Sequence, residues 1–143
     1  MRAWTVAALA ALGGPAATGP AFALEATPAL VCAGAMQTLF QKPYTRLRTI
    51  VIEGNEAQVF RSPDGSYEVA CYLQGDTVIW RTEKAPGFTR PRRWRTDPRD
   101  ERVTWTAYHG MDLLVRVISP KNENDRITKL FLLEDLHKLV KLP

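Results

Sequence analysis

The chain has 143 residues, of which 24% are charged and 45% hydrophobic, and its 19 basic residues outnumber 15 acidic ones. This length favours a single domain that can bury its own core without a structural metal. Beyond the N-terminal segment no apolar run approaches the ~20 residues of a membrane-spanning helix, so we expect no transmembrane segment in the rest of the chain. The mildly positive charge favours encounters with anionic surfaces but does not define a fold.

The first 23 residues have the pattern of an export signal. Arg2 supplies a positive start, Trp4 to Leu12 an apolar stretch, and residues 21–23 (Ala-Phe-Ala) a small-residue cleavage site. We therefore expect residues 1–23 to be a signal peptide and residues 24–143 to form one exported domain, periplasmic or secreted.

Only two cysteines are present, Cys32 and Cys71. In an oxidising compartment two such thiols favour a disulfide. Closing a loop of roughly 40 residues contributes about 4 kcal/mol in the chain-entropy model. The pair lacks C-x-x-C spacing and a flanking cation that would lower a thiol pKa, so we predict a structural bridge rather than a redox-active pair.

The middle of the chain alternates between strand patterns and turn residues. Gly54-Asn55 and Gly75-Asp76 are dipeptides that tolerate the positive φ of tight hairpins, and residues 62–65 (Ser-Pro-Asp-Gly) form a turn signal. The alternation from Tyr67 to Gln74 places Cys71 on the more apolar face. The predicted strands before the long connection are Thr45–Glu53, Ala57–Arg61, Tyr67–Gln74 and Thr77–Thr82.

The connection from Glu83 to Glu101 has no helix or strand period and contains three prolines. Connections this long inside a compact domain are uncommon and are usually functional or disordered. Guanidinium groups bind phosphate and carboxylate through a bidentate fork, and an indole adds a stacking face. We therefore hypothesise a binding site for an anionic envelope component or an acidic protein surface, and do not expect nucleic acid. Its residues would be Arg90, Arg92, Arg93, Trp94 and Arg95.

The same connection also has a purely structural interpretation. Asp97, Asp100 and Glu101 lie in the same stretch and can neutralise half of the six arginines between residues 90 and 102. Trp94 can pack on the sheet as a lid. Exposed ion pairs of this kind contribute only ~0–1 kcal/mol each, so the charges alone do not define a site.

After this connection the strand pattern returns at Val103–Tyr108, Leu113–Ile118 and Ile127–Leu133. Consecutive strands joined by short turns pair as antiparallel neighbours, which predicts an all-β meander that closes into a small barrel or forms a two-layer sandwich. The ends are less regular. At Cys32–Phe40 a short helix competes with a strand, and Glu134–Leu142 is left open as a helix turn or a last strand.

The hexapeptide from Ser62 to Tyr67 resembles the Ser-x-x-Gly-x-x-Tyr loop of the periplasmic inhibitors of C-type lysozyme, which are also small exported β proteins. The loop is one residue shorter here and also matches an ordinary hairpin turn. The basic chain would repel a basic lysozyme at long range. No residue role is carried over from that family.

The sequence contains few residues that could support catalysis. His109 and Asp112 could meet at a hairpin tip, which leaves a hydrolase-type enzyme as one alternative, whereas His137 stands alone. No phosphate loop, nucleophile elbow or metal-ligand set is recognisable. We therefore expect a non-catalytic binding module without cofactor or metal.

A second alternative is a small carrier that holds an apolar ligand inside a lipocalin-like barrel. Its interior would be lined by Val103, Trp105, Leu113 and Val115. In small barrels such positions are normally filled by packed side chains. The lipocalin Gly-x-Trp motif is absent from the early strands.

Overall fold

The computed structural model describes residues 25–108, 112–122, 124 and 126–140. The predicted signal peptide and the turn at 109–111 lie outside the described residues. The described chain forms two helices and seven strands: α1 (Pro28–Phe40), β2 (Thr45–Ile52), β3 (Asn55–Arg61), β4 (Glu68–Gln74), β5 (Thr77–Lys84), β6 (Arg102–Tyr108), β7 (Asp112–Ile118), β8 (Arg126–Leu132) and α2 (Leu133–Val140). Each predicted strand is present, and most of their ends are shifted by only one or two residues.

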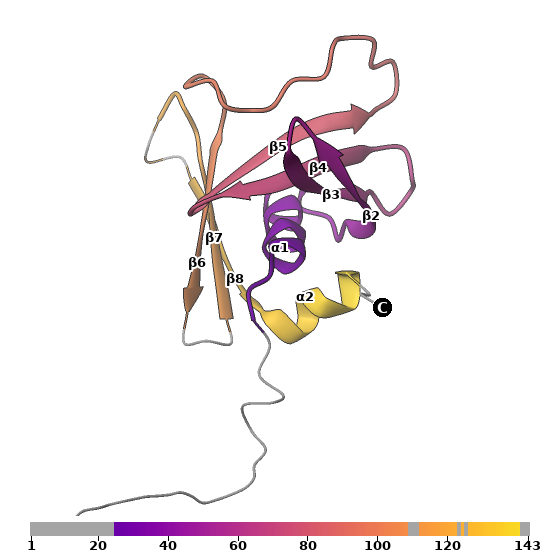
Figure 1. Cartoon of the computed structure of the whole chain (residues 1–143). Helices are drawn as coiled ribbons and strands as arrows, with labels where there is room; N and C mark the ends of the chain where they lie inside the picture. The colour runs from indigo at the N-terminus through magenta and orange to yellow at the C-terminus, as the bar shows by residue number, and fades with distance from the viewer. Residues whose placement is uncertain (1–24, 109–111, 123, 125, 141–143) are drawn as a thin grey trace, which may run out of the picture.

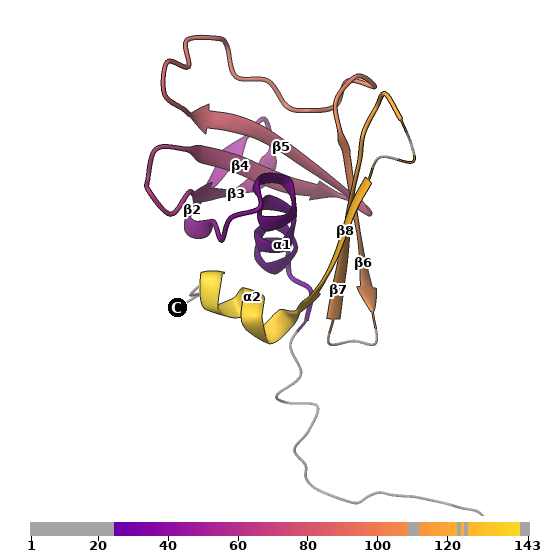
Figure 2. The ribbon, with the colours of Figure 1, turned by 180° about the vertical axis from the view of Figure 1, so that it is seen from behind.

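The seven strands form one antiparallel sheet in chain order, which confirms the predicted meander. β5 and β6 are joined through only two residue pairs, Thr77–Thr104 and Val78–Val103. At this seam the sheet turns sharply and divides into two blades, β2–β5 and β6–β8 (Figures 1 and 2). β2 and β8 lie at opposite ends of the strand order, so the sheet is not closed into a barrel.

The two edge strands carry irregular or charged positions. In β2 the register against β3 shifts between Arg46 and Arg48. In β8, Lys129 pairs with the fully buried Val115 of β7, so its charge projects from the inner face of the edge strand. The inner face is here the face of the sheet toward α1, and the outer face is the opposite one.

Helix α1 lies in the angle between the two blades (Figure 1). Thr27 caps its start by accepting a hydrogen bond from the Leu30 N–H, and a proline occupies its first turn, where the missing N–H costs nothing. Gln41 ends it in the left-handed conformation, at φ 56°. Nine of its residues are buried, as in a helix that is surrounded on nearly all sides. The competition between helix and strand at Cys32–Phe40 is therefore decided in favour of a helix.

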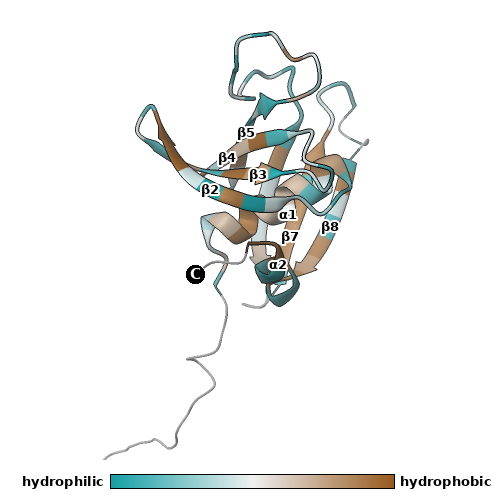
Figure 3. Cartoon of the chain, turned by 90° about the vertical axis from the view of Figure 1, so that its right-hand side faces the viewer, coloured by the Kyte–Doolittle hydropathy of each residue, from teal (hydrophilic) through white to brown (hydrophobic). Residues whose placement is uncertain are grey.

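Gly34 allows α1 to approach its neighbours closely. A Cβ atom at this position would lie 2.9 Å from Leu113 Cδ2 and 3.3 Å from both Leu136 Cδ1 and Phe131 Cδ2. These atoms belong to β7, α2 and β8, so the glycine lies where α1 meets three elements. The C-terminal segment, left open by the sequence, forms α2, whose buried residues include Leu136 and whose outward side is hydrophilic (Figure 3).

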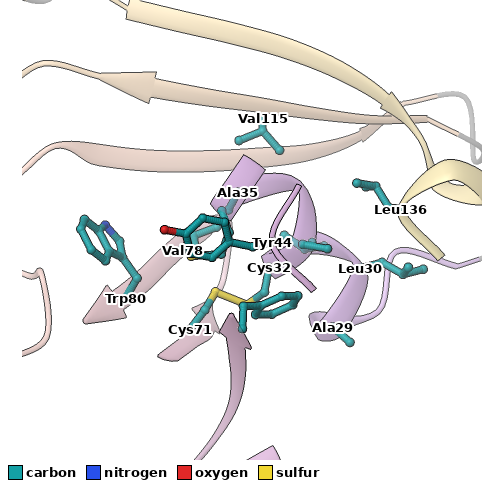
Figure 4. Close-up of a cluster of buried hydrophobic side chains, with 14 of the residues drawn as sticks. Ala29, Leu30, Cys32, Ala35, Tyr44, Cys71, Val78, Trp80, Val115 and Leu136 are labelled. Atoms are coloured by element: carbon teal, nitrogen blue, oxygen red, sulfur yellow. A yellow bond between two sulfur atoms is a disulfide. The ribbon is translucent and has the colours of Figure 1, made fainter. Parts of the chain in front are cut away.

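The residues expected to line a carrier interior form a filled core instead. Val103, Leu113 and Val115 are at most 1% exposed and belong to the same cluster as the residues of α1. Figure 4 shows Val115 of this set beside α1. Trp105 is half-buried near the seam, where its indole N–H donates to the Gly75 carbonyl at 3.0 Å. None of the described helices is long and apolar enough to span a membrane.

The predicted disulfide joins Cys32 of α1 to Cys71 of β4, with 6.0 Å between the Cα atoms. Both residues are fully buried within the main core (Figure 4). Because Cys71 pairs with Trp80 across β4 and β5, the bridge fixes α1 against the middle of the first blade.

Replacing both cysteines by alanine is expected to lower the free energy of unfolding by about 4 kcal/mol, because the unfolded chain regains the freedom of a 39-residue loop. Urea unfolding of the oxidised wild type and the double variant measures the difference. Adding reductant should destabilise the wild type by a similar amount and leave the variant unchanged. An equal response to reductant in both proteins would contradict the bridge.

Candidate functional site

The arginine-rich loop, residues 85–101, connects β5 to β6 across the top of the molecule in Figure 1. The loop contains no helix or strand, as predicted, although β5 extends two residues further than expected. Since β6 pairs only with the first two residues of β5, the rest of that edge is open. The loop covers part of it, and the Arg95 N–H donates to the Trp80 carbonyl at 2.8 Å.

Trp94 lies on the outer face of the first blade. Its ring meets Tyr72 edge to face with centroids 4.8 Å apart, and the Arg81 guanidinium lies 4.6 Å from its ring centroid. It packs on a small outer cluster around the fully buried Val59 and Ala70. Trp94 therefore covers the sheet, in agreement with the structural interpretation.

Arg95 lies on the inner face, the side of the sheet opposite to that of Trp94, because it packs on Trp80. Its guanidinium lies over the Trp80 ring, 4.7 Å from the centroid. Its Nε is buried and has no hydrogen-bond partner among the described residues. The loop thus divides the predicted binding residues between two faces.

The inner face contains an open groove of about 630 Å³, which we call the inner groove. This volume lies within the range of small-molecule sites. Its described lining contains five aromatic rings and three arginines but no carboxylate, imidazole or thiol. The lining residues are Phe40, Tyr44, Tyr67, Val69, Trp80, Thr82, Ala85, Phe88, Arg90, Pro91, Arg93 and Arg95.

The three arginines of the inner groove differ in their partners. Arg93 donates two hydrogen bonds to the Asp100 carboxylate, at 2.8 and 2.7 Å. This pairing raises the pKa of Arg93 and lowers the pKa of Asp100. Arg90 and Arg95 form no ion pair with any described residue, although the charge of Arg95 helps to lower the pKa of Asp100, so the groove retains two guanidinium groups that no carboxylate binds directly.

The arginines outside the inner groove are paired with acids. Arg92 lies 3.7 Å from Glu83, which also binds Arg81. Arg99 binds the Asp97 carboxylate through two hydrogen bonds of 3.0 and 2.9 Å, and this pairing lowers the pKa of Asp97. The positive charge of the loop is therefore largely compensated except at the inner groove.

A second cavity, of about 430 Å³, lies at the seam between the blades. It is lined by charges of both signs, including Asp97 and Asp100 beside Arg95 and Arg102. This mixed lining gives the cavity no preference for a ligand charge. It is the weaker candidate.

The hairpin turn at 62–67 forms one rim of the inner groove. The Asp64 carboxylate accepts hydrogen bonds from both serine hydroxyls of the turn and from the Ser66 N–H, and these bonds lower the pKa of Asp64 to about 2. The turn presents Tyr67, which is 41% exposed, at the groove. Across it, burial together with the nearby Tyr67 and Asp64 raises the pKa of Tyr44.

The structure brings Arg90, Arg93 and Arg95 together in one groove and places Arg92 and Trp94 elsewhere. The aromatic wall was missed, because its rings come from α1, the link between α1 and β2, the turn at 62–67, β5 and the loop. Of the alternative catalytic pair, His109 lies outside the described residues, whereas Asp112 begins β7. His137 is exposed on α2. The described residues contain no cluster of acids, histidines and cysteines that could hold a metal ion.

Comparison of the chain with protein-family models, characterised proteins and solved structures finds no significant match. The proposal below therefore depends on the geometry of the inner groove and on the charges of its lining.

Replacing Asp64 by asparagine is expected to flatten the pH dependence of stability in acid. The pKa of the Asp64 carboxyl is about 2 in the folded chain and 3.8 in the unfolded chain. The carboxylate therefore contributes its full share to the free energy of unfolding above about pH 4, and this share is lost as the pH falls through about 2. Urea unfolding at several acidic pH values measures this change. An unchanged profile in Asp64→Asn would contradict the assignment.

Replacing Trp94 by alanine is expected to destabilise the protein by about 2 kcal/mol, less than the ~3–5 kcal/mol of a fully buried aromatic. The loss reflects the uncovered outer cluster and the ring contacts with Tyr72 and Arg81. Chemical unfolding measures it. A stability equal to that of the wild type would show that the ring does not cover the sheet.

Proposed function

We propose that this protein is an exported, non-catalytic binding module that holds a small anionic ligand in the inner groove. The observation that carries the proposal is the pair of arginines that form no ion pair with a described residue, Arg90 and Arg95, at an aromatic concavity whose described lining contains no acidic residue. A hydrogen bond to a charged group contributes about 1.5–3 kcal/mol, so two such donors can select an anion over a neutral analogue.

A small ligand suits this site better than an acidic protein surface. The groove is concave, and its volume of about 630 Å³ matches a ligand of ordinary small-molecule size. On the outer side of the loop, where a flat partner would bind, Arg92 lies near Glu83 and Arg99 is paired with Asp97.

A binding role without catalysis is supported by the chemistry of the lining. General acid–base or nucleophilic catalysis near neutral pH commonly uses an imidazole, carboxylate, thiol or activated hydroxyl. The described lining offers guanidinium groups, two phenols, the Thr82 hydroxyl and the Trp80 indole N–H as polar side-chain groups. Burial keeps the Tyr44 phenol protonated, because it raises the pKa of that group.

Export is supported by two independent features. Residues 1–23 have the pattern of a signal peptide. The buried bridge between Cys32 and Cys71 is of a kind that persists in oxidising compartments. Ligands encountered outside the cytosol are therefore the relevant ones.

The proposal is tested with the amphipathic anion anilinonaphthalene sulfonate, whose fluorescence rises in an apolar site. Arg90→Gln and Arg95→Gln should each weaken its binding by about tenfold or more, as expected for the loss of one charged hydrogen bond. Binding by the wild type should also weaken as salt is raised.

The matched control is Arg92→Gln, which removes an equally basic side chain that lies near Glu83. Its affinity for the dye should equal that of the wild type. Equal loss in all three variants would indicate a general charge effect. No binding of the dye by the folded, oxidised wild type would overturn the proposed function.

A further inference from the structure

We infer that the ligand of the inner groove is a single acyl chain with a terminal anionic head, a carboxylate or a phosphate. This inference rests on the proposed function and names the chemical class of its ligand. It depends on three features of the lining: its hydrogen-bonding groups, the state of its aromatic rings and the position of its charges.

The hydrogen-bonding groups disfavour a polyhydroxylated ligand such as an anionic sugar. Each sugar hydroxyl needs an acceptor for its proton, and buried polar groups without partners are costly. The described lining contains no carboxylate or amide side chain, its three guanidinium groups can only donate, and its side-chain acceptors are limited to the hydroxyl groups of Tyr44, Tyr67 and Thr82. The lining therefore matches a ligand with few polar atoms outside one anionic group.

The aromatic rings at the floor are already engaged with one another. Phe40 stacks on Tyr44 with centroids 5.0 Å apart and meets the Trp80 ring edge to face at 5.3 Å. A face of Trp80 is covered by the Arg95 guanidinium. A planar aromatic ligand gains most by stacking on a free ring face, whereas an aliphatic chain packs equally well on ring edges. The floor thus favours an acyl chain over an aryl group.

The charges give the ligand a direction. All three arginines of the groove come from one wall, the arginine-rich loop, whereas the opposite wall comes from the end of α1 and the start of β4. Asp64 adds negative charge in the hairpin turn at 62–67, which contributes Tyr67 to that opposite wall. We therefore place the anionic head at Arg90 and Arg95 and the chain across the floor that contains Trp80 and Val69.

The test measures displacement of anilinonaphthalene sulfonate by straight-chain carboxylates and alkyl phosphates of increasing length, all below micelle-forming concentrations. Affinity should rise about two- to fourfold with each methylene, since each one removes apolar area from water, and should then level off when the groove is full. The carboxylate and phosphate series separate the two head groups. Either series showing this dependence supports the inference.

The controls vary one part of the ligand at a time. Naphthoate carries the same carboxylate on a flat ring, and an alkyltrimethylammonium ion carries the same chain on a positive head. Both should compete at least tenfold more weakly than the carboxylate of matched size. If the dye binds but naphthoate competes better than every acyl anion, the ligand class is wrong while the proposed function stands. If the dye itself does not bind, both fail.

A matched pair of variants locates the chain. Ala85→Phe adds bulk to the groove lining and should make the affinity level off at a shorter chain. Thr89→Phe adds the same bulk at an exposed position of the loop that does not line the groove and should leave the chain-length dependence unchanged. Identical behaviour of both variants and the wild type would place the chain elsewhere.

The last experiment measures binding of the protein to vesicles of anionic phospholipid. Free acyl anions should bind to the protein in the absence of any bilayer. Binding to vesicles without binding to free acyl anions would overturn the inference, because the recognised object would then be a charged surface rather than a single chain.

Discussion

The packing of α1 into the bend of the sheet is the constraint on which the rest of the structure depends. A helix whose buried residues occur on nearly all sides has no stable exposed state, and here two blades and α2 surround it. Gly34 permits the close approach to three neighbours, and the bridge from Cys32 fixes the helix to β4. The helix occupies the space that a closed barrel would have enclosed.

The same packing creates the inner groove. The two blades separate to admit α1, and β5 therefore shares only two residue pairs with β6. The rest of this edge of β5 is left for the loop. Residues 94 and 95 then lie on opposite faces of that edge, one covering the outer cluster and the other stacking on Trp80. A long connection with no regular structure of its own thus takes its shape from the edge that it covers.

Much of the fold was predictable from the sequence because each hairpin is encoded locally. Turn dipeptides such as Gly54-Asn55 and the alternation around Cys71 depend only on neighbouring residues, and these strands were predicted nearly to their ends. The state of Cys32–Phe40 could not be decided from the sequence, because this mostly apolar segment matches both a short helix and a strand, and its burial on nearly all sides depends on distant elements. The open sheet also depends on this helix.

The candidate site was predictable only in part. Charge and proline content indicated the loop, and three of its five proposed residues meet in one groove. The face of the sheet on which each loop residue lies depends on the hydrogen bond from the Arg95 N–H to the Trp80 carbonyl of β5, and this bond joins residues that are distant in the sequence. The aromatic wall brings together residues as distant as Phe40 and Phe88, and no local pattern connects them.

An open sheet also has two free edges, where an unrelated strand could add and start aggregation. The register shift between Arg46 and Arg48 interrupts the regular hydrogen-bonding pattern along β2, and Lys129 places a charge on the inner face of β8 that a strand joining there would have to bury. Each edge strand therefore carries a feature that disfavours the addition of a further strand, although the sheet is not closed into a barrel.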